Sequence, residues 1–166
     1  MDQERLLFAR FEELGIASET LEHDATYRVE ESRHLAETLP GGRSKSLLVA
    51  DKDQQLILIT ARGSTRVDLK KVGDAVGIRG RLSFAKGQVM EEVLNVSPGH
   101  LTPFALVNDR QGQIACMVLD AELLREPCIW AHPLRNTAST AVSSADLERF
   151  AAVHARRVLK LDLAAG

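Results

Sequence analysis

The sequence predicts an α+β fold in a single domain, and three observations support this prediction. At 166 residues the chain has room for one domain of ordinary size, and 45% hydrophobic with 27% charged residues is typical of a globular protein. Patterns at helical spacing alternate irregularly with short apolar runs that are typical of strands. Several of these runs are joined by polar turns, as in hairpins. We therefore expect a mixed or antiparallel sheet flanked by helices, and not a doubly wound parallel sheet.

The first helix is expected to end at Gly15, because a glycine at this place can cap a helix. Its apolar stripe consists of Leu6, Leu7, Phe11 and Leu14. A second helix is expected over residues 29–39, since Pro40 and the two glycines after it stop a helix. Residues 46–50 and 56–60 are rich in Leu, Ile and Val and flank a short polar stretch, which predicts two strands in a hairpin.

The middle of the chain is expected to hold short helices at residues 68–75 and 88–95, with a strand at 77–84 between them. A loop rich in Pro and Gly follows. Apolar runs at 104–107 and 114–119 then flank a polar turn and predict a second hairpin.

The last third is expected to begin with a brief helix over residues 120–124, capped by its first residue, an aspartate. Strands are expected at 128–131 and 139–142. The sequence Ser-Ser-Ala-Asp at 143–146 has the form of a capping box and predicts a helix that runs to about His154.

Basic residues gather in one segment of a chain whose formal net charge is -2. Between residues 62 and 86, seven Lys and Arg stand against two Asp, which leaves a local net charge of +5. Lys and Arg supply most of the free energy of binding to nucleic-acid phosphates. The segregation therefore indicates either a basic face that contacts nucleic acid or an ordinary solvated surface.

Common catalytic motifs are absent from the sequence, among them GxxxxGK[ST], GxGxxG, HExxH and GxSxG. The five histidines are scattered without the spacing of a metal site, so we expect neither a metal nor a cofactor. Cys116 and Cys128 lack CxxC spacing and are expected to be buried thiols. No apolar run approaches the roughly 20 residues that span a bilayer, and the first residues lack a signal-peptide pattern. We therefore expect a cytoplasmic protein without a membrane partner.

Three places are harder to explain as scaffold. Lys45 directly precedes the expected strand at 46–50, where its cation can hold a phosphate or a carbonyl oxygen. Gly99 and Pro103 frame a loop that can present fixed peptide groups to a ligand. His132 precedes a proline and a cluster of small polar residues. Each place also has a purely structural interpretation, as a solvated lysine, a connecting loop and a turn.

In order and spacing, these places resemble the YbaK/prolyl-tRNA synthetase-associated editing-domain family. Lys45, in the segment SKSLLVAD at 44–51, is similar to the family's signature lysine. The other motifs that match are TRVDLKK at 65–71, RLSFA at 81–85, the GxxxP loop from Gly99 to Pro103, and His132-Pro133 with Asn136-Thr137-Ala138. The resemblance runs from about residue 21 to residue 150. Within the family the pattern is closest to the stand-alone PrdX-like proteins, which deacylate Ala-tRNA(Pro).

The resemblance implies a barrel-like sheet and a hydrolase that cleaves the ester of a mischarged tRNA, with water as the nucleophile and no metal. It makes Lys45, Gly99 and His132 the catalytic residues. Lys45 would anchor the terminal adenosine phosphate or the substrate carbonyl, His132 would line the pocket, and the adenosine 2′-hydroxyl would assist the attack. The substrate-binding residues that it implies are Ser46, His100, Leu101, Thr102, Pro103 and Asn136.

The implied partners are the acceptor end of a mischarged tRNA and, as a second candidate, prolyl-tRNA synthetase. From the basic segment we add four tRNA contacts, Arg62, Arg66, Lys70 and Lys71. Ser46 stands where many members of the family have Asn, and Trp130-Ala131 stands where a Gly-Phe pair is common. Because both departures touch the amino-acid pocket, Cys, Ser or Thr stay open as the amino acid removed. From other classes, a tRNA-binding module without catalysis and a small-molecule-binding domain stay open as well.

Overall fold

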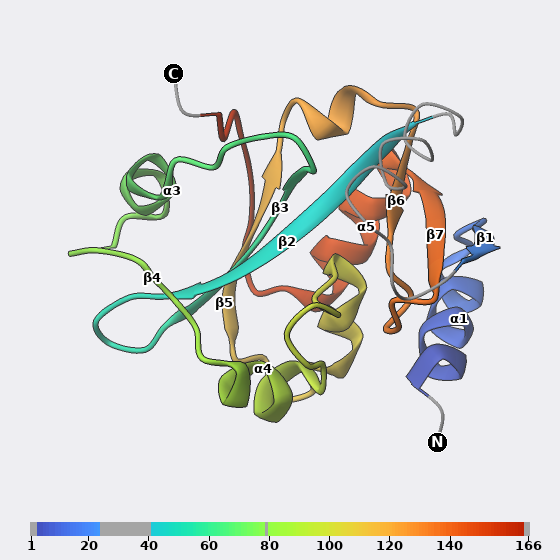
Figure 1. Ribbon diagram of the computed structural model, residues 1–166, viewed down its shortest axis with the longest axis horizontal. Coiled ribbons are helices and arrows are strands. Elements are labelled where there is room, and N and C mark those ends of the chain that lie inside the picture. Colours follow the sequence, from blue (N-terminus) through green and yellow to red (C-terminus); the bar gives the residue numbers. More distant parts are fainter. Residues whose placement is uncertain (1–2, 24–40, 79, 165–166) are drawn as a thin grey trace.

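The computed structural model describes residues 3–23, 41–78 and 80–164, and its elements are arranged around one mixed sheet (Figure 1). The helices are α1 (Gln3–Leu14), α3 (Leu69–Val76), α4 (Gly87–Leu94) and α5 (Ser144–His154), with the 3₁₀-helices η1 (Pro103–Asn108) and η2 (Leu123–Arg125). None of the helices in these ranges is long and apolar enough to cross a membrane. The helix expected at residues 29–39 lies outside the described residues.

The described part of the chain contributes eight strands to the sheet. They are β1 (Glu19–Glu22), β2 (Gly42–Ala50), β3 (Leu56–Arg62), β4 (Ser83–Phe84), β5 (Ile114–Asp120), β6 (Cys128–Ala131), β7 (Ala138–Ser143) and β8 (Val158–Leu161). Their order is β1-β7-β6-β2-β3-β5-β8, with β4 paired to β2 beside this path. The pairs β2/β6, β3/β5 and β5/β8 are parallel and the others antiparallel, which confirms the mixed sheet. Among the described strands the sheet is not closed into a barrel, because β1 and β8 are its two ends.

Helices cover both faces of the sheet, and each face has its own apolar cluster (Figure 1). On one face, α1, α4, η1 and α5 pack over the larger cluster, where Phe104 contacts Phe11 and Phe150 at ring-centroid distances of 5.2 and 5.8 Å. On the other face, α3 packs over a smaller cluster that includes Val49 and Val72. Side chains of alternate strand residues therefore lead to two different sides of the molecule.

The hairpin of β2 and β3 is confirmed, but β2 is longer than the sequence predicted. It begins at Gly42, so Lys45 lies inside the strand and not before it. The first residues of β2 are polar and carry no apolar strand pattern. They are extended because they pair with β3 on one side and, at Gly42 and Arg43, with β6 on the other.

The predicted strand at 104–107 is wrong, because these residues form η1. The Thr102 side chain caps this helix by accepting from the Phe104 amide, and Pro103 takes its first position, where a missing N–H costs nothing. The second hairpin therefore does not exist. The strand expected at 77–84 shrinks to the two residues of β4. Strands β1 and β8 were not predicted.

Capping explains the helix boundaries that were predicted well. Asp68 caps α3 by accepting from the amides of Lys70 and Lys71. Ser143 caps α5 by accepting from the amide of Asp146, as the capping-box pattern indicated. Asp120 has a different role from the one expected, because it ends β5 and its carboxylate accepts from the backbone amides of Arg62 and Glu122.

Candidate active site

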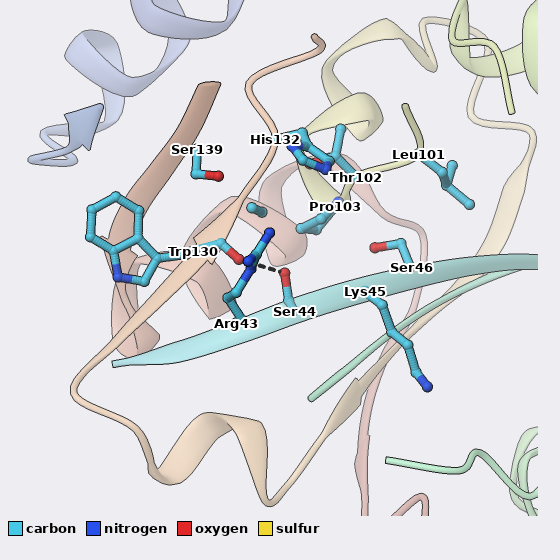
Figure 2. A pocket seen from close by; sticks show the side chains of 11 residues that line it. Arg43, Ser44, Lys45, Ser46, Leu101, Thr102, Pro103, Trp130, His132 and Ser139 are labelled. Atoms are coloured by element: carbon cyan, nitrogen blue, oxygen red, sulfur yellow. Dashed lines mark hydrogen bonds between the residues drawn. The ribbon is translucent and has the colours of Figure 1, made fainter. Parts of the chain in front are cut away.

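A small recess forms where β2, the segment before η1, and the ends of β6 and β7 meet (Figure 2). It encloses about 270 Å³, including space open to solvent. Its walls come from four segments, at residues 43–46, 101–103, 130–132 and 139. The segments at 43–46, 101–103 and 130–139 are far apart in the sequence, so the fold brings them together.

The β2 wall of the recess presents hydroxyl groups. Ser44 and Ser46 are alternate residues of the strand and therefore share a face. The Ser44 hydroxyl donates to the Trp130 carbonyl oxygen at 2.8 Å, and the Ser46 hydroxyl lies 2.9 Å from that of Thr60. Lys45, between the two serines, lines the recess at its rim and directs its amine away from His132 and Ser46 (Figure 2).

The second wall is the segment that enters η1. Leu101, Thr102 and Pro103 line the recess, and Thr102 and Pro103 are buried. Gly99 precedes them in a tight turn, in which the His100 amide donates to the Ser97 carbonyl oxygen at 3.0 Å. The φ of +91° at Gly99 favours glycine at this position, after a proline. The glycine therefore shapes the approach to the recess and does not line it.

His132 forms the third wall and is partly buried. Its Nδ1 lies 3.1 Å from the Ala138 carbonyl oxygen, and because a carbonyl can only accept, Nδ1 carries the proton. Burial lowers the pKa of His132, and the neighbouring His23, Arg43 and His100 lower it further, against the opposing effect of the bond to Ala138. The ring is therefore neutral at pH 7, and Nε2 offers a lone pair.

A second histidine, His23, supports this wall from the position directly after β1. The Nε2 atom of His23 lies 2.9 Å from the Ser139 hydroxyl, and the rings of His23 and His132 are 6.3 Å apart between centroids. The backbone amide of His23 donates to the Thr137 carbonyl oxygen at 2.9 Å. The residue after β1 therefore holds the end of the connection that leads into β7.

The connection between β6 and β7 is held by Arg135. Its guanidinium donates to Glu4 of α1 at 3.1 Å, to Glu22 of β1 at 2.6 Å, and to the Thr137 hydroxyl at 2.8 Å. The hydrogen bond from Arg135 lowers the pKa of Glu22. Within this connection Leu134 has a φ of +70°, a conformation that costs free energy in a non-glycine residue. We infer that the ion pairs offset this strain and hold the connection in one shape.

The structure brings together six of the nine predicted catalytic and substrate-binding residues. Those that line the recess are Lys45, Ser46, Leu101, Thr102, Pro103 and His132. Gly99 and Asn136 are not among the lining residues. His100 lies in a neighbouring recess, where its Nδ1 is 3.2 Å from the Ser97 hydroxyl.

The four predicted tRNA contacts lie outside the recess, and they differ in their contacts. Arg62 pairs with Glu126 at 2.8 Å, so its charge is partly engaged within the chain. Arg66 and Lys70 are exposed, and the exposed Lys71 donates from Nζ to the Ala164 carbonyl oxygen at 3.3 Å. In the described ranges no group of three or more His, Cys, Asp or Glu side chains could hold a metal ion.

Five lining residues were not among the predicted catalytic and substrate-binding residues, although the resemblance had already placed Trp130 and Ala131 at the amino-acid pocket. They are Arg43, Ser44, Trp130, Ala131 and Ser139. The alternation of Ser44 and Ser46 would have pointed to a shared strand face if β2 had been extended toward its start. Ser139 could have been found from the small polar cluster after His132. Nothing in the sequence indicated that the Trp130 carbonyl oxygen would accept a hydrogen bond from the Ser44 hydroxyl.

Comparison with known proteins gives matches along most of the chain. Residues 23–150 match the family model of the aminoacyl-tRNA editing domain. The chain is 31% identical over 150 residues to "Prolyl-tRNA editing protein ProX" of Acetoanaerobium sticklandii, with 90% of each chain covered. It is 31% identical over 139 residues to "Prolyl-tRNA synthetase associated domain-containing protein 1" of Danio rerio, with 82% of this chain and 74% of the relative covered. A solved structure described as a candidate trans-editing enzyme for prolyl-tRNA synthetase matches the fold with a TM-score of 0.77 at 22% identity, over 100% of this chain and 99% of that one.

Proposed function

Because this chain belongs to the aminoacyl-tRNA editing domain family, we propose that it is a free-standing deacylase that hydrolyses mischarged tRNA(Pro), with Ala-tRNA(Pro) as its substrate. One observation of this structure supports the proposal in addition to the family membership. Six residues that the sequence pattern singled out, from three separate segments, line a single recess. The relative named as a prolyl-tRNA editing protein supports the choice of tRNA.

The reaction is the attack of water on the carbonyl carbon of the aminoacyl ester. The bond between this carbon and the ribose oxygen breaks, the ribose oxygen takes a proton, and the products are a free amino acid and tRNA. In our proposal the neutral His132 accepts a hydrogen bond at Nε2 from the substrate or the water. Fixed peptide groups of residues 101–103, held in place by the turn at Gly99, orient the acyl group. Positioning of this kind accounts for much of the rate when no strong acid or base is present.

Lys45 acts at the rim of the recess in this proposal. Its amine points away from the hydroxyls of the β2 wall, so it is placed better for a phosphate of the tRNA end than for the ester carbonyl (Figure 2). An ammonium group on a flexible stem is suited to binding phosphate as a point charge. We therefore assign Lys45 to anchoring the terminal nucleotide.

The choice of alanine as the amino acid follows from the resemblance and from the need for a second site that removes errors. A synthetase gains only about 1–3 kcal/mol from one methylene, so a second site that admits the smaller amino acid and excludes the larger can remove the error. Ser44 and Ser46 make this wall polar, which keeps serine and cysteine as competing substrates.

We further propose that the reaction needs no metal and takes place in the cytoplasm, on tRNA that a synthetase has just charged. Prolyl-tRNA synthetase is the candidate protein partner, since relatives carry its name. A chelator should leave the rate unchanged. Loss of activity on chelation and its return with added metal would contradict this part of the proposal.

The experiment that tests the proposed function measures amino-acid release from Ala-tRNA(Pro), beside Pro-, Cys- and Ser-charged controls. We expect the wild-type protein to hydrolyse Ala-tRNA(Pro) selectively and Lys45→Ala to lose at least about tenfold in kcat/KM, equivalent to about 1.4 kcal/mol. Lys160→Ala is the matched control, because Lys160 is an exposed lysine of β8 that forms an ion pair with Glu148 and lies outside the recess.

Two other results would change the conclusion in defined ways. Selective release from the Cys- or Ser-charged tRNA would keep the reaction and replace the substrate. Binding of these tRNAs without release from any of them would replace the deacylase by a tRNA-binding module.

A further inference from the structure

Phe84 is a large apolar side chain on the surface, with an exposed fraction of 65%. It belongs to β4, which pairs with the end of β2 so that Phe84 lies opposite Val49. Side chains directly opposite each other in an antiparallel pair project to the same face. Val49 shares its face with Lys45, four residues earlier on the same strand. Phe84 and Lys45 therefore lie on one face of the sheet, the face that α3 covers (Figure 1).

Exposed cations lie close to Phe84 in the sequence and along a groove beside β4. A groove of about 880 Å³, open to solvent, runs between α3 and the segment before β4, and Lys70 and Arg81 line it. Lys86 follows Phe84 by two residues, and Lys70, Arg81 and Lys86 are all exposed. Asp74 is the acidic residue among those that line the groove. Among the described residues, no ion pair neutralises any of these three cations. An exposed aromatic ring among cations is the combination that binds single-stranded nucleic acid.

The position of Phe84 relative to the recess fits the binding of a single-stranded nucleic acid. Strand residues rise about 3.3 Å each, so Val49 lies about 10 Å along β2 from Ser46, which lines the recess. Among the described strands, β6 pairs with the first two residues of β2, and β4 pairs with the last two. The stretch of β2 between these two pairings separates the recess from Phe84. A chain of a few nucleotides can cover this distance, with its phosphates passing Lys45.

We propose that Phe84, together with the exposed Lys70, Arg81 and Lys86, binds the single-stranded 3′ segment of an RNA by stacking a base on its ring. The proposal rests on the function proposed above, since it assigns the nucleotides just before the acylated end to this surface. Stacking supplies affinity without reading the base sequence, because every base has an aromatic face. The cations supply the affinity for phosphate.

The test measures binding of a fluorescent single-stranded RNA nonamer that ends in CCA, and of uncharged tRNA, by fluorescence anisotropy. We expect Phe84→Ala and Phe84→Leu to weaken binding about tenfold, since the loss of one stacked base has an effect of this order, and Phe84→Trp to retain it. Val153→Ala is the matched control, because Val153 is the other strongly exposed large apolar side chain among the described residues, at 54%, and it lies on α5. Thermal melting of each variant checks that the fold is intact.

Each outcome decides the proposal. Equal binding by wild-type and Phe84→Ala, or full binding by Phe84→Leu, overturns base stacking. Loss of binding to prolyl-tRNA synthetase by Phe84→Ala, with RNA binding unchanged, overturns it in favour of a protein-docking surface. If the wild-type protein releases no amino acid from any tRNA, the deacylase proposal fails, while the ratio of RNA affinities still decides the role of Phe84.

Discussion

His154 is a titratable residue outside the recess, on the last turn of α5. Its ring contacts Phe150 with centroids 4.6 Å apart, and its Nε2 is buried and has no hydrogen-bond partner among the described residues. Burial lowers the pKa of His154, Arg10 lowers it further, and Asp109 opposes them. The folded protein therefore favours the neutral ring more strongly than the unfolded chain does.

This preference makes stability depend on pH. In the unfolded chain His154 takes up a proton as the pH falls through about 6.5, whereas in the folded protein it stays neutral to a lower pH. The unfolded state then binds more protons, so the free energy of unfolding falls as the pH drops below 6.5, until the folded pKa is reached. His132 has a lowered pKa as well and contributes with the same sign.

We predict that His154→Phe makes the protein less sensitive to acid. At pH 7.5 the variant should be as stable as wild type or more stable by up to about 1 kcal/mol, since an unpaired buried polar atom is removed. Between pH 7.5 and 5.5 the difference should grow in favour of the variant. Urea denaturation at both values measures it. A constant difference across this range would mean that His154 does not titrate as its burial indicates.

The connection from His132 to β7 shows how an element holds a site. Arg135 ties it to α1 and β1, and the side chains of Arg135, Glu4 and Glu22 are 30%, 25% and 70% exposed. Single exposed ion pairs stabilise proteins by about 0–1 kcal/mol, whereas a guanidinium shared by two carboxylates is geometrically more constrained. The connection supplies His132, so its shape matters to the proposed reaction.

We predict that Arg135→Gln lowers the free energy of unfolding by about 1 kcal/mol and slows release of the amino acid about tenfold, because small displacements of a positioned group are costly in rate. Arg125→Gln is the control, since Arg125 is 80% exposed and pairs with Glu122 at 3.5 Å. Urea denaturation and the release assay measure the two effects. Unchanged release by Arg135→Gln would show that the ion pairs do not position His132.

Elements were predictable where local chemistry decided them. The β2/β3 hairpin follows from two apolar runs around a polar turn, and α5 from the capping box at its start. The residues of η1 were predicted as a strand because a short apolar run shows no helical period. Thr102 and Pro103, however, are residue types that often begin a helix. The polar start of β2 and strand β1 depend on pairing partners far along the chain, which local patterns do not contain.

Part of the recess was predictable as well, but from the family resemblance and not from local sequence patterns. Residues such as Lys45 and His132 were identified because they occur in the same order along the chain as the motifs of the family. The pairing of Ser44 with the backbone of Trp130 joins residues 86 positions apart and follows from the parallel contact of β2 with β6. Such contacts are properties of the whole sheet, so the residues that they bring to the site could not be found from the sequence.

At the scale of the whole molecule, charge is distributed unevenly. The formal net charge is -2, yet α3 and the segment before it carry exposed cations such as Lys70 and Arg66. A local patch of cations can bind RNA even when the protein as a whole is acidic. Binding releases counterions from the RNA, so the affinity of the protein for RNA depends on salt concentration. The net charge alone would have pointed away from an RNA partner.

We predict that the double variant Arg66→Ala/Lys70→Ala binds uncharged tRNA about tenfold more weakly at low salt than wild type. The slope of log K against log salt concentration should also become shallower by about 1–2, since each phosphate contact contributes about 0.7–0.9. The control is Arg110→Ala/Arg156→Ala, which removes the same charge from exposed positions outside this surface. If both double variants change affinity and slope equally, net charge and not the α3 side of the sheet determines binding. If the Arg66→Ala/Lys70→Ala protein alone changes, the RNA lies along α3, which directs its 3′ end past Phe84 and Lys45 toward the recess.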